Sequence, residues 1–464
     1  MKGTTTNKLA TLLTATLLLA SCASQSQQPW NVMKTIDQQI VAPTFPDKEY
    51  LITDYHTDGD TLYTEAIRRA IEACANNGGG RVVIPAGDYL TGPIQLKSNV
   101  NLHVSQGAMV RFVTDPKLFP TVLTRIEGID CYNISPLIYA YDETNVAITG
   151  TGTLDGQADT TNWFSQRRIG KVKLPDGTEV NEKTRLYQMK EDSVALRLRV
   201  FEGEEGIRPQ FINLYKCKNV LLEGFTLHRS PFWLIHPLMS ENVTVRRVTM
   251  DSHGNNNDGC DPESCTNVRI EECNFNTGDD CIAIKSGRDE DGRYWNLPSQ
   301  NIIVRNCSMK DGHAGVAIGS EITGGCYNVW VEGCQMDSPA LDRIIRIKSN
   351  AIRGGEVKNV YVRNLTVGEC RRAILGFEQK YWHVDDGPYP PYFHNIHLEN
   401  ITSQKSQYVL MLDGFEDKVQ ARDIYLKNCQ FNGVTEPEIN KVTGVENIQF
   451  EDVTVNGQPF KGID

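Results

Sequence analysis

From residue 219 onward, apolar and polar positions follow a register that repeats along the chain. Each repeat opens with an asparagine and a β-branched residue, and apolar or cysteine side chains follow three and six residues later. The opening residues are Asn219, Asn242, Asn267, Asn301, Asn328, Asn359, Asn395 and Asn447, with Asp423 in the same place of one further repeat. Repeats of 23 residues (219 to 242) to 36 residues (359 to 395) with short strands are typical of a parallel β-helix. The pattern therefore predicts an all-β, single-stranded parallel β-helix.

The start of the folded chain has a different period. Ala66, Ile67, Ala70, Ile71 and Cys74 recur at helical spacing, and three glycines at 78–80 end that helix. Short strands are expected over 81–84, 94–96 and 100–104. We expect the helix to cap the open end of the stack, because exposed edge strands otherwise aggregate.

The first 22 residues are expected to be a signal peptide. A weakly basic start precedes an apolar run from Leu9 to Ala20, which is too short to span a bilayer comfortably. The run ends in Leu19-Ala20-Ser21-Cys22, which resembles the lipobox of bacterial lipoproteins; an ordinary secretory signal is the alternative. Lipidation of Cys22 would anchor the protein to the outer membrane through a linker over 23–45. Residues 23–27 lack an acidic pair, so a periplasmic orientation is expected.

Composition narrows the possible partners. The net charge of −11 and the pI near 5.4 argue against nucleic acid. Several of the thirteen cysteines occupy core positions of the repeat, so they are expected to be small apolar residues. No cysteine or histidine cluster has zinc spacing, and no metal or cofactor is expected.

Candidate chemistry recurs in the later halves of five successive repeats, which places it on one face of the stack. The residues are Asp258, Asp279, Asp280, His313, Arg346, Lys348 and Tyr381. Arg346 and Lys348 flank Ile347, so in a strand both cations point outward and the isoleucine points inward. Gly278 suggests a turn that lets both adjacent aspartates reach the same groove.

The motifs at 256–259 (N-N-D-G), 278–281 (G-D-D-C), 312–315 (G-H-A-G), 346–348 (R-I-K) and 378–381 (E-Q-K-Y) resemble, in this order, the pectin-degrading glycoside hydrolases that include polygalacturonases and rhamnogalacturonan hydrolases. The resemblance implies a right-handed β-helix and hydrolysis with inversion. It makes Asp279 the general acid, with Asp258 and Asp280 activating water and His313 supporting them. Arg346 and Lys348 would bind a substrate carboxylate, and Tyr381 would lie at the cleavage subsite. Asn257 and Ala314 depart from the common Thr and Gly of the family, which puts specificity in doubt.

Inverting hydrolases usually hold their two carboxyl groups roughly 6.5–9.5 Å apart, and crowded carboxylates raise one pKa. Three alternatives stay open: a rhamnogalacturonan hydrolase, a calcium-dependent pectate lyase, and a non-catalytic carbohydrate-binding β-helix. The catalytic domain is expected over 46–464. Within it, residues 157–207 lack the register and are expected to form an inserted loop region that walls one end of the groove and favours exo-cleavage.

Overall fold

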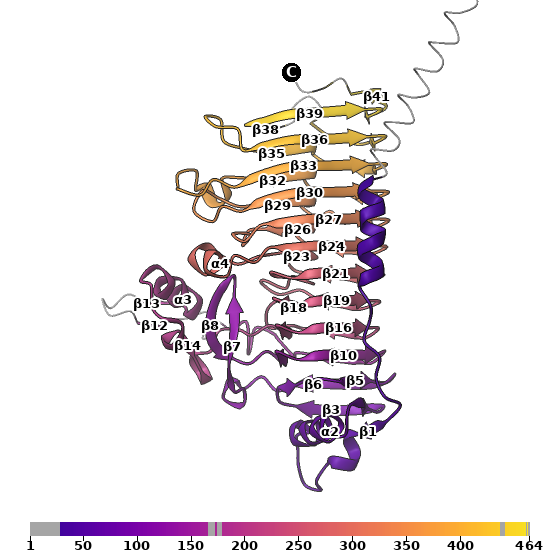
Figure 1. Ribbon diagram of the computed structural model, residues 1–464, viewed down its shortest axis with the longest axis vertical. Helices are drawn as coiled ribbons and strands as arrows, with labels where there is room; N and C mark the ends of the chain where they lie inside the picture. Colours follow the sequence, from indigo (N-terminus) through magenta and orange to yellow (C-terminus); the bar gives the residue numbers. More distant parts are fainter. Residues whose placement is uncertain (1–27, 166–171, 174–178, 437–440, 461, 463–464) are drawn as a thin grey trace, which may run out of the picture.

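The computed structural model describes residues 28–165, 172–173, 179–436, 441–460 and 462. The chain winds into a right-handed parallel β-helix whose coils stack along the long axis of the molecule (Figure 1). Two long sheets run the length of the stack and a third is interrupted in the middle, so the fold predicted from the repeats is confirmed.

The first sheet contains thirteen strands: β1 (Glu49–Leu51), β2 (Gly80–Ile84), β5 (Val100–Val104), β10 (Thr144–Gly150), β16 (Lys218–Glu223), β19 (Glu241–Arg246), β21 (Thr266–Glu271), β24 (Ser299–Arg305), β27 (Cys326–Glu332), β30 (Glu356–Arg363), β33 (Tyr392–Glu399), β36 (Ala421–Lys427) and β39 (Val445–Glu451). The second contains β3 (Gly87–Thr91), β6 (Ala108–Phe112), β11 (Thr153–Asp155), β17 (Thr226–His228), β20 (Thr249–Ser252), β22 (Asn274–Thr277), β25 (Ser308–Asp311), β28 (Gln335–Met336), β31 (Thr366–Glu369), β34 (Thr402–Lys405), β37 (Gln430–Phe431), β40 (Thr454–Val455) and the antiparallel β41 (Gln458–Pro459).

The third sheet is interrupted in the middle of the stack. Its first part contains β4 (Ile94–Gln95), β9 (Ile138–Tyr141), β15 (Ile212–Tyr215) and β18 (Ile235–Leu238). Its second part contains β23 (Ile282–Ile284), β26 (Ala314–Gly319), β29 (Arg343–Lys348), β32 (Ala373–Glu378), β35 (Tyr408–Asp413) and β38 (Lys441–Thr443). Isolated bridges through Cys260 and Glu263 join the two parts. The candidate residues lie at this interruption.

The repeated asparagines form a ladder along the first sheet. From Asn219 to Asn395, each side-chain amide donates to the amide oxygen of the asparagine one coil earlier, over 2.7 to 3.3 Å. The same residues have φ between 54° and 61°. Asparagine tolerates this left-handed conformation better than most residues and also supplies the donor and acceptor of the ladder. Asparagine therefore recurs at this position both because it tolerates the left-handed backbone and because its side chain forms the ladder of hydrogen bonds.

The interior contains the apolar residues that the register predicts. Those three places after the asparagines are buried from Leu222 to Leu398, and Phe450 packs against the core from the last coil. Cys273, Cys307 and Cys334 stack in successive coils, and all twelve cysteines of the described residues are buried and free. The cysteines there are core residues, as predicted.

The first coil is covered by helix α2 (Thr64–Asn76), whose buried residues are the five that the helical spacing picked out. Its preceding segment forms the 3-10 helix η1 (Ile52–Tyr55). The helix lies across the end of the stack, next to β1 and β3 (Figure 1). The predicted cap is confirmed.

A second helix occupies much of the segment predicted as a linker, so that prediction is wrong for residues 28–39. This helix lies along the outer face of the first sheet, beside β21 to β30 (Figure 1). Trp30, Met33, Ile36 and Ile40 pack against side chains of β24 and β27. Asp37 bridges Arg269 and Arg305, each over 2.9 Å. The apolar residues recur at helical spacing, and their burial holds the segment to the stack.

A lobe projects from the stack at the level of the interruption (Figure 1). It contains the hairpin β7 (Thr121–Ile126) and β8 (Ile129–Ile134), and α4 (Asp289–Trp295) contacts it. The described part of the predicted insertion adds β12 (Val172–Lys173), β13 (Glu179–Val180), α3 (Glu182–Glu191) and β14 (Val200–Phe201), with β14 paired to β8. A separate apolar core holds the lobe together through Leu186, Phe201, Ile126, Ile129 and Cys131. The described part of the insertion is therefore folded.

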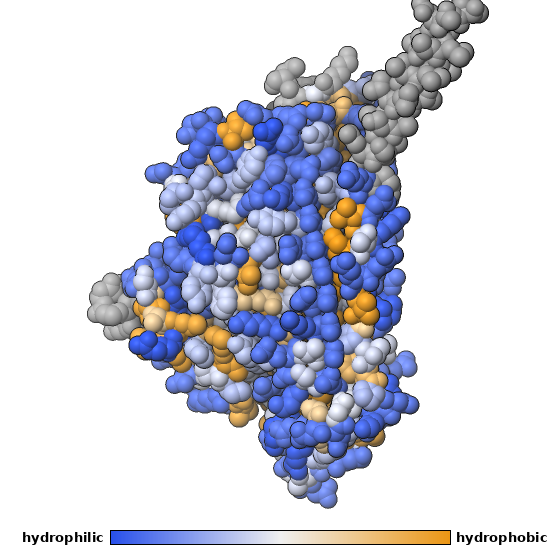
Figure 2. Space-filling view, in the orientation of Figure 1, coloured by the Kyte–Doolittle hydropathy of each residue, from blue (hydrophilic) through white to orange (hydrophobic). Residues whose placement is uncertain are grey.

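The signal peptide and Cys22 lie outside the described residues. Among the helices that are described, none has the length and apolarity to cross a bilayer. The surface of the stack is mostly hydrophilic, with hydrophobic atoms gathered beside the helix of residues 28–39 and over the lobe (Figure 2).

Candidate active site

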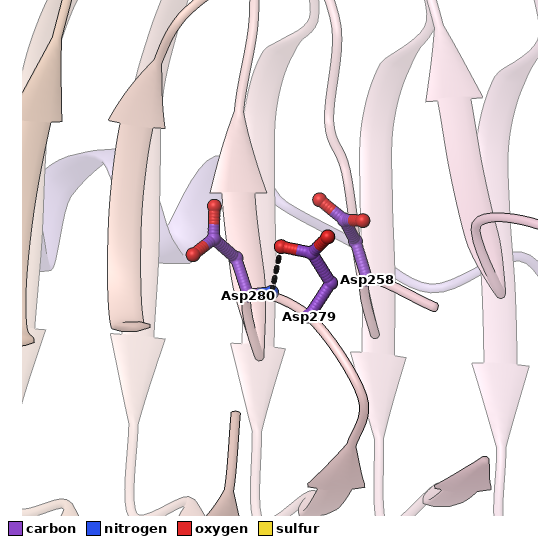
Figure 3. A group of neighbouring side chains, drawn as sticks. All are labelled: Asp258, Asp279 and Asp280. Carbon is purple, nitrogen blue, oxygen red and sulfur yellow. Dashed lines mark hydrogen bonds between the residues drawn. The ribbon is translucent and has the colours of Figure 1, made fainter. Parts of the chain in front are cut away.

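Asp258, Asp279 and Asp280 meet at the interruption of the third sheet (Figure 3). Asp258 lies between β20 and the Cys260 bridge, and the other two occupy a bend between β22 and β23. One carboxylate oxygen from each lies within 4.8 Å of the others. These nearest oxygens are closer than the roughly 6.5–9.5 Å that usually separates the two carboxyl groups of an inverting hydrolase.

Local backbone packing explains why the acids converge. Gly278 approaches the preceding coil so closely that an added Cβ would lie 2.7 Å from the Gly254 oxygen. Asn257 is buried, donates to the carbonyls of Ser230 and Phe232, and accepts from the Gly254 amide. The bend at Gly278 agrees with the turn predicted there. The Asp258 segment is held by the hydrogen bonds of the Asn257 side chain to backbone groups.

His313 lies beside Asp279, as expected. Its Nδ1 is 3.0 Å from Asp279 Oδ1, which also accepts the backbone N–H of Asp280. Burial acts to raise the pKa of Asp279, but the hydrogen bond from His313 and the charge of Lys348 lower this pKa to about 2. The same hydrogen bond raises the pKa of His313.

Asp258 and the neighbouring Asp261 have raised pKa values, and Asp258 is the one among the three predicted acids. It is buried, and burial together with the nearby Asp261 and Asp279 raises the pKa of Asp258 well above its ordinary value. Crowding was expected to leave a proton on the acid, Asp279. In the free protein the pKa of Asp279 is lowered instead, because His313 stabilises the ionised Asp279, and the raised pKa is that of Asp258.

Two predicted cations project from β29 toward this site. Lys348 Nζ donates to Asp280 Oδ2 over 2.8 Å, and Arg346 donates to Glu378 over 3.0 Å. Ile347 between them is fully buried in the core, so the predicted alternation is confirmed. The two cations are adjacent to the acids but already have carboxylate partners.

Tyr381 begins the 3-10 helix η5 (Tyr381–His383) and lies next to the cations. Its ring centroid is 5.9 Å from the Arg346 guanidinium and 5.7 Å from Lys348 Nζ. The structure thus brings together all seven residues predicted for the groove.

Several buried charges beside the acids were not predicted. Lys285 Nζ lies 3.9 Å from both Asp258 and Asp261 and 3.3 Å from Glu321. Although burial acts to lower it, these carboxylates raise the pKa of Lys285. A sequence signal existed, because Ile282 and Ile284 point inward and the strand period turns Lys285 outward. Glu321 had no comparable signal, since its contact depends on a loop.

The site can perform acid–base chemistry on a bound substrate. Its three carboxylates offer a proton donor and a base, and its cations can bind an anionic group. The same three oxygens are near enough to share a cation. Lys348 and Lys285 already supply positive charge to two of these acids.

Known proteins resemble this chain in both sequence and fold. The family model of the glycosyl hydrolases family 28 matches residues 201–460. An endo-polygalacturonase of Pectobacterium carotovorum is 30% identical over 82% of this chain and 87% of its own. An exo-poly-alpha-D-galacturonosidase of Dickeya chrysanthemi is 25% identical over 88% and 72%. The crystal structure of a hyperthermoactive exopolygalacturonase from Thermotoga maritima superposes with a TM-score of 0.83 at 36% identity, covering 92% of this chain and 97% of that one. The match to more than half of this chain, with the acids inside it, shows that the protein belongs to glycosyl hydrolase family 28.

Proposed function

We propose that this glycoside hydrolase cleaves α-linkages between galacturonate units of pectin and inverts the anomeric carbon. The observation that carries the proposal is the cluster of Asp258, Asp279 and Asp280 beside two outward cations. The polygalacturonase names of its relatives support the same substrate class.

The proton needed by the leaving group comes from Asp279 in this mechanism. Its Oδ1 accepts two hydrogen bonds, which leaves Oδ2 as the position for the proton. In the free protein the pKa of Asp279 is lowered and that of Asp258 is raised. A substrate carboxylate that pairs with Lys348 neutralises one of the groups that lower the pKa of Asp279, which favours protonation of Asp279 in the complex, and Asp258 acts as a base in its ionised form.

Hydrolysis then needs one water molecule. Asp258 and Asp280 hold this water and remove its proton as it attacks the anomeric carbon, while Asp279 protonates the departing glycosidic oxygen. The site ends with the proton on the base and can return to its starting state. The oxygens of the acids lie closer than in most inverting enzymes, so the stereochemistry is to be measured directly.

Asp279→Asn tests this assignment. An amide cannot deliver the proton, so kcat on polygalacturonate should fall roughly 10³-fold or more while the melting temperature is kept. Asp251→Asn, at a partly exposed carboxylate of β20, is the matched control and should stay within about twofold of the parent. Near-normal release of reducing ends by Asp279→Asn would refute the acid. Proton NMR of the first product should show the β anomer.

Recognition of the uronate is assigned to Arg346 and Lys348. Replacing either by Ala should raise KM and lower kcat on polygalacturonate, because a charge-assisted contact is lost. Methyl-esterified pectin should be a poorer substrate for the parent protein. Equal rates on esterified and free polymer would contradict this role, and a higher rate on rhamnogalacturonan would assign the other pectin backbone.

The lobe supports exo-cleavage. The hairpin turn at Gly128 contacts Arg288 and Glu321 so tightly that an added Cβ would lie 2.6 Å from Arg288 Cβ. Tyr187 of α3 lies under the Arg288 guanidinium, 4.3 Å from its ring centroid. Glu321 is in turn a partner of Lys285, next to Asp258. The lobe therefore packs against Arg288 and Glu321, and from this position it would admit only a chain end.

We also propose that lipid on Cys22 anchors the enzyme in the periplasm. The proposal rests on the sequence at 19–22 and on the acid-free residues at 23–27. Cys22→Ala should release soluble protein from the membrane fraction. Removal of the native protein from intact cells by external protease would contradict the orientation.

A further inference from the structure

Trp382 is an exposed aromatic residue next to Tyr381 that the mechanism above does not use. It is 56% exposed. Its ring stacks on that of Tyr381, with centroids 5.2 Å apart and planes at 24°. Aromatic faces bind the apolar faces of sugars, so an exposed tryptophan here is a candidate contact for substrate.

Two buried arginines lie against the Trp382 ring. The guanidinium carbons of Arg353 and Arg288 are 4.9 and 5.7 Å from its centroid. Arg353 is only 2% exposed and Arg288 only 9%. Within the described part of the chain, Nη1 of each arginine has no hydrogen-bond partner. Buried guanidinium donors normally have partners, so two unpaired ones under one ring indicate a place for an anion.

The carboxylates nearest to these two donors do not form hydrogen bonds with them. Glu321 is 3.7 Å from Arg353 Nη1, and Glu127 is 3.9 Å from Arg288 Nη1. Both distances exceed that of a hydrogen bond. Glu127 also has two other partners, Lys183 and Tyr187. Each arginine therefore keeps a donor for a third carboxylate.

We infer that Trp382, Arg288 and Arg353 form a second uronate subsite, which binds the galacturonate unit next to the one held by Arg346 and Lys348. This inference rests on the proposed function. The Arg353 guanidinium lies 6.0 Å from the Tyr381 ring centroid, and Arg346 lies 5.9 Å from it. Because both cation groups border the same tyrosine, the second subsite adjoins the first.

In the free protein both unpaired donors are buried, and the Trp382 ring lies against both guanidinium groups. A carboxylate reaches them when this ring moves outward, and the ring can then stack on the sugar. The enzyme would thereby recognise two consecutive free carboxylates. A methyl ester at the second unit would lose the charge-assisted hydrogen bonds and should bind more weakly.

Kinetics on trigalacturonate and its methyl ester test the subsite. Arg353→Gln and Trp382→Ala should each raise KM for the free acid roughly tenfold, with kcat within about threefold, because one charge-assisted hydrogen bond or one stacking contact is lost. Arg353→Gln should also reduce the preference for the free acid. Tyr294→Ala, at a residue that is 80% exposed on α4, is the matched aromatic control and should behave as the parent. Unchanged KM in both variants, or a fall in kcat alone, would overturn the inference.

Fluorescence gives a readout that does not depend on turnover. In the Asp279→Asn protein, digalacturonate should change tryptophan emission, whereas its dimethyl ester should cause a much smaller change at the same concentration. Adding Trp382→Phe should abolish the change and keep binding. A change that survives Trp382→Phe would refute movement of this ring. If the parent releases no product from trigalacturonate, the proposed function fails; if it does and the variants match it, only the second subsite fails.

Discussion

His313 and Asp279 show how one contact sets the charge of the site. The hydrogen bond between them lowers the pKa of the aspartate and raises that of the histidine, so the pair is ionised over a wider pH range than either residue alone. Asp258, by contrast, is buried beside other carboxylates, which raise its pKa. Residue types and order alone could not reveal this, because the sequence does not say which of three carboxylates the histidine contacts.

The pH dependence of stability follows from the two shifts. The pKa of His313 is higher in the folded protein than in the unfolded chain, where it is about 6.5. Protonated His313 therefore stabilises the folded state fully below about pH 6.5, and this stabilisation is lost as the pH rises through the folded pKa. The lowered pKa of Asp279 means that its contribution is lost as pH falls from about 4 toward 2. The melting temperature of His313→Ala should therefore lie further below the parent at pH 5 than at pH 9.

His313→Asn is the matched variant for that measurement, because an amide can donate to Asp279 without titrating. Its difference from the parent should depend less on pH than that of His313→Ala. Equal deficits for His313→Ala at pH 5 and pH 9 would show that charge in this pair contributes nothing.

At the scale of elements, the asparagine ladder connects successive coils. Asn301 donates to Asn267 and accepts from Asn328, and its backbone is left-handed with φ of 59°. Asn301→Ala loses both hydrogen bonds and strains the backbone, so it should destabilise by about 2–3 kcal/mol. Asn301→Gly loses only the hydrogen bonds and should cost less. Thermal melts of both variants compare the two losses of stability. Equal losses would show that backbone strain contributes nothing.

The helix of residues 28–39 belongs to the stack although it precedes the β-helix in sequence. Trp30 is buried against the first sheet, and the guanidinium of Arg363 lies 3.7 Å from its ring centroid. Trp30→Ala should cost about 3–5 kcal/mol of packing, release the helix and expose residues 28–45 to trypsin. Because the helix covers another face than the acids, activity at 25 °C should stay near that of the parent. Val32→Ala, at a half-exposed position, is the control.

The repeat was predicted correctly and the helix of residues 28–39 was missed, for different physical reasons. The repeat was predictable because each coil must place apolar residues inside at a fixed register, and the fold confirms that register. The helix was missed although Trp30, Met33, Ile36 and Ile40 recur at helical spacing. Its four apolar residues follow a signal-like segment, and only the face of β24 and β27 that they cover makes the helix stable. Likewise Glu321 and Arg353 lie on loops, whose paths the register does not define, and they contact Lys285 and the Tyr381 ring, respectively.

At the scale of the whole molecule, the rigid stack and the lobe have separate tasks. Successive coils place Asp258, Asp279 and Lys348 on strands or bends that the neighbouring coils hold, which favours a fixed catalytic geometry. The lobe is held together by its own core, and buried ion pairs such as Arg125 with Glu263 over 3.0 Å attach it beside them. Because this attachment is tight, the lobe should act as a permanent wall.

A permanent wall predicts how the polymer is degraded. Polygalacturonate should yield mono- or digalacturonate from the first minutes, with little early fall in viscosity, because only chain ends fit against Arg288 and the lobe. Tyr187→Ala removes a ring that lies under the Arg288 guanidinium, and it should raise the share of longer products if the lobe then loosens. Arg185→Ala on the same helix, whose partner Glu205 is exposed, is the control. Chromatography and viscometry on the same samples decide the matter. A rapid loss of viscosity with a ladder of mid-sized oligomers from the parent protein would show that chains pass through the groove, and the lobe would then be a side wall with no effect on where cleavage begins.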